Sequence, residues 1–280
     1  MKMKKKLMFA MLASSMLSGV AYAGCGMPGC TADSKDAGLS STPSQIQVDL
    51  VKDKLQKMGL KSETHALKQI PGLIEVDGPR GITYFTDSTA RYLIAGHLLD
   101  PVARKDLTKE RQEKAKIGLL KKAINAGHLV VGGDKQAKNA IVVFDDPDCP
   151  YCRKLETQLG ANSGVKAYHV MTPLAQLHPQ AEEHTKAILC SRHMNKTLES
   201  IMLGGQSPST EKCANPQYAQ MRAEHASIAN TYGVNSTPTL VRLTDGQVWS
   251  GYMPIALLRQ WAAGKEVSAA AVNAAIQAGQ

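Results

Sequence analysis

The sequence predicts a two-domain α/β protein, in which a small mixed unit precedes a larger layered unit of alternating strands and helices. Three observations support this prediction. The length of 280 residues is typical of about two domains. One helical stripe and a few alternating strands fill residues 44–100. A continuous apolar run at 141–144 is typical of a strand buried on both faces. From there to residue 264 the pattern of apolar residues differs from that of residues 44–100.

The composition narrows the classes of function. Hydrophobic residues make up 43% and charged residues 20%, which is ordinary for a globular protein. Aromatic residues are only 5%, so few rings are present to stack on nucleic-acid bases. Beyond the N-terminus no apolar stretch reaches the roughly 20 residues of a membrane-spanning helix. We therefore expect neither a polytopic membrane protein nor a nucleic-acid partner.

The first 23 residues have the pattern of a secretory signal. Four lysines precede an apolar segment over 7–20, and the small residues Ala21 and Ala23 occupy the positions that a signal peptidase reads. Cleavage after Ala23 removes 23 residues and four lysines, which leaves 257 residues and lowers the net charge from +9 to +5. So small an excess of positive charge is typical of a solvated protein surface. The alternative is a lipoprotein acylated at Cys25, which Tyr22 disfavours.

Residues 24–43 are rich in Gly, Ser, Thr, Asp and Pro and predict a flexible extension. Ser44 is a candidate N-cap for a helix that ends at Gly59. Residues 72–86 indicate a hairpin, and residues 91–96 a further strand. Over residues 44–100 this is a thin core, so we expect the unit to find its missing contacts in a second copy of itself.

Residues 101–130 predict a linker, with a highly charged helix over 105–126 whose charges face solvent. The unit at 131–265 then shows, in order, a strand at 141–144, a short helix, a strand at 165–171, helices at 181–203 and 216–232, a hairpin at 239–252 and a helix at 255–263. This order predicts a thioredoxin-like layered fold with a helical insertion. Residues 266–280 are an Ala-rich tail that either extends a helix or frays.

Six cysteines lie beyond the signal and form three local pairs, Cys25 with Cys30, Cys149 with Cys152, and Cys190 with Cys213. In an oxidising compartment such cysteines are disulfide candidates before they are metal ligands. Cys190 and Cys213, if bonded, close a loop worth about 3 kcal/mol; the alternative, a second redox pair, lacks C-x-x-C spacing. Cys25 and Cys30 are a possible second disulfide. Metal capture by this pair together with Met27 is the weaker alternative.

The chemistry is expected at Cys149-Pro150-Tyr151-Cys152, where a buried strand meets a helix. A zinc site with this spacing needs a second pair of ligands nearby. At the helix N-terminus, unpaired N–H groups and the helix dipole stabilise a thiolate on Cys149. Cys152 lies one turn later, where it reaches a mixed disulfide on Cys149. We interpret the pair as nucleophile and resolving thiol; a plain local disulfide and half a metal site are the alternatives.

A second motif, Thr237-Pro238, enters the apolar strand that begins at Thr239. Pro238 is a candidate for a cis peptide bond, with an ordinary trans proline as the alternative. A proline has no N–H, so it places no donor against a reactive sulfur. The backbone of Thr237 is then available to pair with an extended substrate.

Taken together, residues 45–263 resemble the periplasmic DsbC/DsbG family of protein disulfide isomerases. Residues 144–152, FDDPDCPYC, are similar to the family active site, and their Pro-Tyr dipeptide is nearer to the DsbG branch. Residues 186–190, KAILC, together with Cys213, are similar to the structural disulfide of the DsbC branch. Residues 233–238 resemble the family's Thr–cis-Pro loop, and residues 72–99 its dimerisation domain.

The resemblance implies a thioredoxin-like catalytic domain joined by a helix to a small α+β dimerisation domain. The expected assembly is a V-shaped periplasmic homodimer whose reactive cysteines face a shared cleft. Its substrates would be misfolded secreted proteins with disulfides, and a DsbD-type membrane reductase would keep it reduced. Pro150, Tyr151, Thr237 and Pro238 are expected to contact substrate. No cofactor and no metal are expected.

The leading functional hypothesis is a thiol–disulfide isomerase, in which Cys149 attacks an incorrect disulfide. One alternative is a DsbG-like reductant that protects single oxidised cysteines. Another is a cleft-binding chaperone whose redox activity is secondary.

Other polar residues near the motif have several interpretations. Asp145, Asp146 and Asp148 either raise the thiol pKa, act as proton carriers, or are solvated loop charges. Four histidines, His169, His178, His184 and His193, have no recognisable metal spacing and are expected at the surface or packed.

Overall fold

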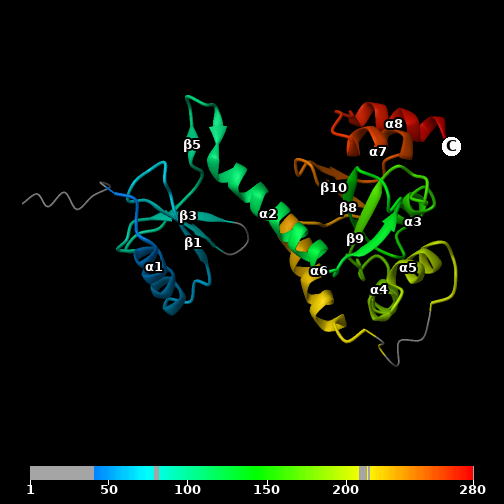
Figure 1. Cartoon of the computed structure of the whole chain (residues 1–280), viewed down its shortest axis with the longest axis horizontal. Helices are drawn as coiled ribbons and strands as arrows, with labels where there is room; N and C mark the ends of the chain where they lie inside the picture. Colours follow the sequence, from blue (N-terminus) through cyan, green and yellow to red (C-terminus); the bar gives the residue numbers. More distant parts are fainter. Residues whose placement is uncertain (1–40, 79–81, 208–212, 214, 280) are drawn as a thin grey trace, which may run out of the picture.

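The computed structural model describes residues 41–78, 82–207, 213 and 215–279. The predicted signal peptide, most of the predicted extension, and Cys25 and Cys30 lie outside the described residues. The chain forms two units connected by one long helix, which runs from the small N-terminal unit to the larger C-terminal unit (Figure 1). Both are mixtures of helix and sheet, as the sequence predicts.

The N-terminal unit packs one helix on a four-stranded antiparallel sheet with strand order β1-β2-β3-β4. Its elements are α1 (Gln45–Lys57), β1 (Glu63–Ala66), β2 (Ile74–Asp77), β3 (Thr83–Thr86) and β4 (Ile94–Ala95). Ser44 caps α1 through a capping box with Gln47. Buried Val51 and Leu55 of α1 pack in one core with Ile74 of β2.

Two strands of this sheet differ from the sequence prediction. β1 was not predicted, because Glu-Thr-His-Ala has no apolar alternation; its backbone pairs with β2, and the Thr64 hydroxyl donates to the carbonyl of Val48 at 3.3 Å. β4 is shorter than the predicted strand at 91–96 and pairs with β3 through only Ile94 and Ala95. The presence of β1 and the length of β4 both depend on pairing with neighbouring strands, which the sequence does not show.

A short hairpin of β5 (Leu99–Asp100) and β6 (Lys105–Asp106) leads into helix α2 (Leu107–Asn125). Asp106 caps this helix by accepting the Lys109 N–H at 2.9 Å. The first half of α2 is less solvated than predicted, because Thr108 is buried and most of its neighbours are half-buried. In its last turns, Leu120 and Ala123 are fully buried in the core of the C-terminal unit.

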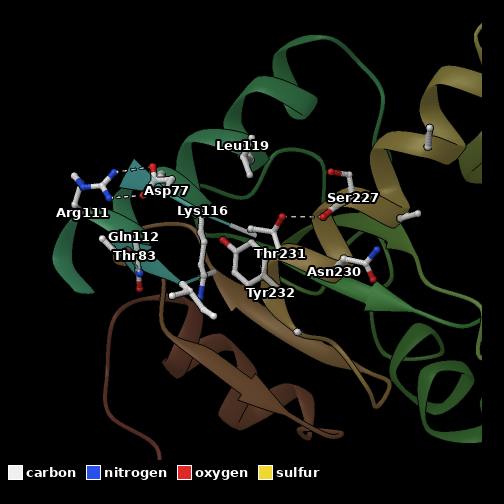
Figure 2. A pocket seen from close by; sticks show the side chains of 16 residues that line it. Asp77, Thr83, Arg111, Gln112, Lys116, Leu119, Ser227, Asn230, Thr231 and Tyr232 are labelled. Atoms are coloured by element: carbon white, nitrogen blue, oxygen red, sulfur yellow. Dashed lines mark hydrogen bonds and ion pairs between the residues drawn. The ribbon is translucent and has the colours of Figure 1, made fainter. Parts of the chain in front are cut away.

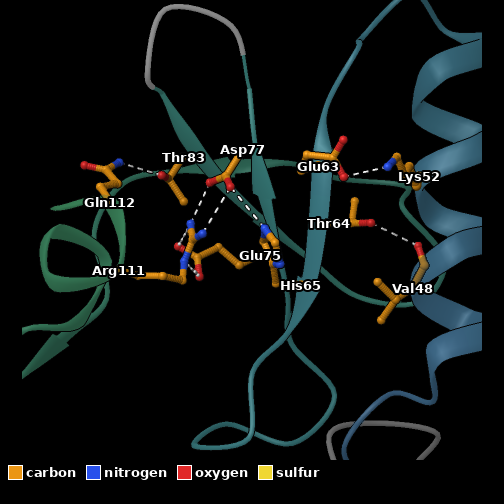
Figure 3. Close-up of polar contacts among 10 residues, drawn as sticks. All are labelled: Val48, Lys52, Glu63, Thr64, His65, Glu75, Asp77, Thr83, Arg111 and Gln112. Carbon is orange, nitrogen blue, oxygen red and sulfur yellow. Dashed lines mark hydrogen bonds and ion pairs between the residues drawn. The ribbon is translucent and has the colours of Figure 1, made fainter. Parts of the chain in front are cut away.

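An ion cluster fixes the start of α2 to the N-terminal sheet (Figure 3). Arg111 donates to the Glu75 carboxylate at 2.6 and 2.7 Å and to the Asp77 carboxylate at 2.6 and 3.1 Å. Burial favours the neutral form of Asp77, but hydrogen bonds from His65 and Arg111 outweigh it and hold the pKa of this carboxyl well below its usual range. Next to it, Gln112 donates to the Thr83 hydroxyl at 2.8 Å.

The C-terminal unit contains a five-stranded sheet with strand order β11-β10-β8-β9-β7. Only β8 and β9 are parallel; the other pairs are antiparallel. The strands are β7 (Val130–Gly133), β8 (Ala140–Asp145), β9 (Lys166–Met171), β10 (Thr239–Arg242) and β11 (Val248–Ser250). The helices are α3 (Pro150–Glu156), α4 (Ala181–Cys190), α5 (Met194–Met202), α6 (Tyr218–Tyr232), α7 (Ile255–Ala262) and α8 (Ala269–Ala278).

Alternate residues of β8 serve two different cores, as the period of a strand dictates. Ile141 and Val143 pack with residues of α3, α7 and α8 on one face. Val142 and Phe144 pack with residues of α2 and α6 on the other. The predicted Ala-rich tail is α8, which Ser268 caps and whose Val272 is buried in the first of these cores.

The helical insertion is broken once more than the sequence predicts. The segment expected as one helix over 181–203 is α4 followed by α5. Ser191 ends α4 in an extended conformation, and its hydroxyl accepts the His193 N–H at 3.0 Å. A serine side chain that competes for backbone groups in this way interrupts a helix.

The ion cluster gives the first prediction. Replacing Arg111 by Leu should lower the free energy of unfolding of the N-terminal unit by about 3 kcal/mol, because Glu75 is almost fully buried and would keep an unpaired charge. Urea denaturation followed by circular dichroism measures the change. Lys114→Leu, on an exposed position of the same helix, is the matched control. Equal stability of the two variants would contradict the prediction.

Candidate active site at the CPYC helix

The CPYC segment lies where β8 ends and α3 begins. After Asp145 the chain turns, with Asp146 accepting the Asp148 N–H at 2.8 Å and the Cys149 N–H donating to the Asp146 carbonyl at 3.1 Å. Cys149 is the N-cap of α3 and Pro150 its first residue, where a missing N–H costs nothing. The turn therefore places Cys149 just beyond the carboxyl end of the central strand β8.

Cys149 and Cys152 differ in their surroundings. Cys149 is 6% exposed, and its thiol lies 3.4 Å from the carbonyl oxygen of Thr237. The peptide bond between Thr237 and Pro238 is cis. Cys152 is fully buried on the inner side of α3. Both thiols are free in the structure.

The two thiols ionise very differently. A hydrogen bond from Cys152, aided by Thr237 and by the backbone N–H groups of Tyr151 and Cys152, outweighs burial and lowers the pKa of Cys149 to about 5. Burial, the hydrogen bond to Cys149 and the charge of Asp145 raise the pKa of Cys152 far above its usual range. Near neutral pH, Cys149 is therefore a thiolate and Cys152 a thiol.

The aspartates around the motif are paired rather than solvated. Asp146 is fully buried, binds His178 at 2.9 Å and accepts the Leu174 N–H at 2.7 Å. The hydrogen bond with Asp146 raises the pKa of His178. Asp148 contacts His184 at 2.9 Å and Arg153 at 2.7 Å. These contacts exclude the interpretation of Asp146 and Asp148 as free loop charges.

The expected substrate-contacting residues surround Cys149. Pro150 is exposed, and Tyr151 is 56% exposed with its ring 6.3 Å from that of Tyr252. Thr237, whose carbonyl oxygen contacts the Cys149 sulfur, is half-buried, and the next residue, Pro238, is buried. The fold thus brings two segments nearly 90 residues apart to the same thiol.

Cys190 and Cys213 form a disulfide that joins the end of α4 to the segment before α6. Ile188 and Leu189, which precede Cys190 in α4, belong to the same buried cluster as Cys149 and Cys152. Cys25 and Cys30 are outside the described residues. Among the residues that the structure describes, no group of three His, Cys, Asp or Glu side chains is arranged to hold a metal ion.

A groove of about 1190 Å³ lies away from the cysteines. It is lined by α2, α6 and the adjoining ends of β2 and β3 in the N-terminal sheet (Figure 2). Lys116 of α2 lies over the ring of Tyr232 of α6, 5.7 Å from its centre. No cysteine lines this groove. The thiol chemistry therefore lies outside this groove.

Sequence reasoning did not assign two buried residues on the inner side of the site to it. His169 and Glu156 are both buried, and His169 contacts Asp145. One signal was present in the sequence, because Glu156 follows Cys152 by four residues and so shares its side of the helix. Nothing in the sequence indicated that β9 places His169 opposite them.

Comparisons with known proteins agree with this geometry. Residues 132–264 match the thioredoxin-like domain family, and residues 31–109 match the N-terminal domain of disulfide bond isomerase proteins. The thiol:disulfide interchange protein DsbC of Escherichia coli is 28% identical over 208 residues, which covers 73% of this chain and 82% of that protein. The two domain matches and the DsbC relatives together support membership of the DsbC family.

Two further comparisons cover different shares of the molecule. The probable thiol:disulfide interchange protein DsbC of Bordetella avium is 27% identical over 273 residues, or 89% of this chain and 95% of that protein. A solved disulfide interchange protein of Neisseria gonorrhoeae is 29% identical, covers 49% of this chain and 94% of that chain, and has a TM-score of 0.43. As a DsbC-family member, the chain is a thiol–disulfide oxidoreductase with a thioredoxin-like domain.

The unequal thiols give the second prediction. In the reduced protein at mildly acidic pH, iodoacetamide should alkylate Cys149 first, and the rate should fall as the pH drops through about 5 because the thiolate is protonated. Peptide mass mapping identifies the labelled cysteine. In Cys152→Ala the inflection should move to higher pH, since the main hydrogen bond is lost. Labelling of Cys152 before Cys149 would overturn this assignment of the thiols.

Proposed function

We propose that this protein is a periplasmic disulfide isomerase that acts as a homodimer, with Cys149 as nucleophile and Cys152 as resolving thiol. The observation that carries the proposal is the thiolate-favouring environment of Cys149 directly beside a fully buried Cys152. A cysteine with a lowered pKa, followed by a fully buried one, is the arrangement that thiol–disulfide exchange requires.

In the first step, the Cys149 thiolate attacks one sulfur of a substrate disulfide. A bond forms between Cys149 and that sulfur, and the other substrate sulfur leaves as a thiolate. In isomerisation, a different substrate thiolate then attacks the adduct, which forms a new substrate disulfide and restores the Cys149 thiolate without net oxidation. In reduction, Cys152 attacks instead, so that the cysteine pair is oxidised and the substrate is reduced by two electrons.

The surface around Cys149 favours a protein as substrate. Tyr151 offers an exposed ring on one side, and Tyr252 lies next to it with Lys154 5.2 Å from the centre of its ring. On the other side, the backbone of Thr237 is where an extended substrate strand would pair. An exposed aromatic ring beside a strand-pairing position suits misfolded chains of varied sequence.

The N-terminal unit supports the homodimer. β4 is the edge strand of its sheet, with a partner only on the β3 side. In this strand and near it in the sequence, large apolar side chains are strongly exposed, including Tyr92 at 70%, Ile94 at 65% and Val102 at 93%. A second copy that pairs at this edge would cover both the unpaired backbone and the apolar patch.

The location and the electron source are proposed from the sequence. The export signal expected at residues 1–23 would deliver the protein to the periplasm. Among the described residues no helix combines the length and the apolar character needed to cross a bilayer. We propose a DsbD-type membrane reductase as the partner that returns Cys149 and Cys152 to the dithiol state.

One observation favours a second candidate, a DsbG-like reductant for single oxidised cysteines, namely the Pro150-Tyr151 dipeptide between the reactive cysteines. The Cys190–Cys213 disulfide favours the isomerase, since the resemblance assigns it to the DsbC branch. Refolding of a scrambled multi-disulfide protein, compared with reduction of a sulfenylated single-cysteine protein, distinguishes the two. Cys149→Ser should abolish both reactions; isomerisation that survived it would contradict the proposal.

The third prediction concerns dimerisation. Ile94→Arg places a charge in the middle of the proposed interface, but the side chain is exposed in the single chain, so folding should be retained. The variant should be a monomer in light scattering, reduce a small disulfide at the normal rate, and fail to rescue scrambled ribonuclease.

Ile46→Arg, on the 73% exposed side chain of α1, is the matched control and should behave like the unmodified protein. A monomeric Ile94→Arg that still isomerised normally would remove the need for a shared cleft. A variant that remained dimeric would place the interface elsewhere.

A further inference from the structure

Two histidines that follow β9 in the chain reach back to the carboxylates next to Cys149. His178 contacts Asp146, and His184 of α4 contacts Asp148. We propose that His178 is a positioning residue for the thiol reaction, whose imidazolium compensates the charge of Asp146 and keeps Cys149 a good leaving group. The inference rests on the dithiol function proposed above and adds to it a residue that controls how readily Cys149 releases a substrate.

The parallel pair of strands brings His178 to the CPYC turn. β9 lies beside β8, and the Thr172 N–H, just after β9, donates to the Asp145 carbonyl at 2.6 Å. The chain therefore leaves the sheet at two neighbouring points, once into the CPYC turn and once into residues 173–180, which we call the β9–α4 loop. Within this loop the His178 N–H donates to the Leu174 carbonyl at 2.9 Å, which forms a tight turn.

Asp146 is the anchor for this loop, and its side chain is fully buried. Its Oδ1 atom accepts the Asp148 N–H at 2.8 Å. Its Oδ2 atom accepts the Leu174 N–H at 2.7 Å and lies 2.9 Å from His178 Nδ1. Of these three partners only His178 can carry a positive charge, and a buried carboxylate is costly without one.

The groups that face His178 favour its charged form. The hydrogen bond with Asp146 has the largest effect, and the charges of Asp146, Cys149 and Asp148 add to it. Together they outweigh burial and raise the pKa of His178. The imidazolium therefore persists to higher pH than in an ordinary histidine, and it feels the charge of the reactive thiolate.

The other charged side chains at this surface belong to Asp148. Arg153 of α3 donates to its carboxylate at 2.7 Å, and His184 of α4 contacts the same carboxylate at 2.9 Å. Loss of charge on His184 would still leave Arg153 on Asp148. Loss of charge on His178 would leave Asp146 with no charged partner among the described residues. His178 is therefore the more sensitive position.

The coupling between His178 and Cys149 acts in both directions. A thiolate that makes an imidazole easier to protonate is itself made easier to form by the imidazolium, and by the same free energy. The hydrogen bond from Cys152 is the main cause of the lowered pKa of Cys149, which is about 5. The charge of His178 adds to this effect.

The chemical consequence lies in the release of substrate. In isomerisation a substrate thiolate attacks the substrate sulfur of the mixed disulfide. The new bond joins two substrate sulfurs, the bond to Cys149 breaks, and its electron pair stays on Cys149 as a thiolate, with no net oxidation. A thiol of lower pKa leaves faster. The charge that develops on Cys149 in this step is the charge that the His178 imidazolium stabilises.

A histidine is not required merely to hold the loop. The Leu174 N–H already binds Asp146, and an uncharged amide side chain offers an N–H donor like that of the ring. What the histidine adds is a positive charge that disappears as the pH rises. Its contribution can therefore be separated from the hydrogen bond.

The first test uses His178→Asn, which retains a donor for Asp146 but has no charge. The pH dependence of Cys149 alkylation by iodoacetamide should show its inflection near 5 in the unmodified mature protein and roughly half a unit or more higher in the variant. In glutathione redox buffers at neutral pH, the equilibrium constant for forming the Cys149–Cys152 disulfide should rise roughly threefold in the variant, because its thiolate is less stabilised. This difference should shrink as the pH is raised and His178 loses its proton.

His193→Asn is the matched control, because His193 is exposed and its side chain makes no capping bond to α5. It should leave the alkylation profile and the disulfide equilibrium of the unmodified protein unchanged.

A second measurement needs no substitution at His178. The assigned NMR signal of its ring is followed against pH in the reduced and in the oxidised protein. Only the reduced protein carries the Cys149 thiolate, so His178 should have the higher pKa in that form. Cys149→Ser should titrate like the oxidised protein. Should His178→Asn fail to fold, this comparison decides alone.

Two results would overturn the inference. One is a His178 ring that titrates at the same pH in both redox forms. The other is a folded His178→Asn with the alkylation profile and disulfide equilibrium of the unmodified protein. A Cys149 that titrates in the ordinary thiol range in the unmodified protein would instead contradict the observation behind the proposed dithiol function, so the two failures are distinguishable.

Discussion

The hydrogen bond from the buried Cys152 thiol to the sulfur of Cys149 is the interaction on which this site depends. It separates the two thiols into a thiolate and a protected thiol, although only two residues lie between them. The bond exists because α3 begins at Cys149, so that Cys152 returns one turn later on the inner side of the helix. β8 ends immediately before this turn, and buried Asp146 holds the turn through its contacts with Asp148 and Leu174.

A second constraint determines where the site is directed. Arg111 ties the start of α2 to Glu75 and Asp77 of the N-terminal sheet, while Leu120 and Ala123 bury its end in the core of the larger unit. A helix held at both ends transmits the orientation of one unit to the other. In the proposed dimer, this would fix the distance between two catalytic surfaces and so the size of the protein that fits between them.

The buried side chains of Asp145, Glu156 and His169 are less completely paired than this junction. Asp77 and Glu75 are satisfied by Arg111, whereas Asp145 and Glu156 share one histidine and retain unpaired oxygens. The first arrangement stabilises a junction. The second leaves three buried polar atoms without a hydrogen-bond partner among the described residues.

The sequence by itself determined the order of the elements, the nucleophile and its helix, and the proline that faces it, because these depend on local periodicity, capping and short motifs. It also singled out Asp145 near the thiols. It did not disclose β1, whose four residues have no strand pattern, nor the break at Ser191, nor that α2 ends inside a core. Only the tertiary structure placed His169 against Asp145 and Glu156, since these residues come from two strands and a helix. Side-chain proximity across parallel strands is set by register and by the helix packed above them, and neither leaves a mark in any one stretch of sequence.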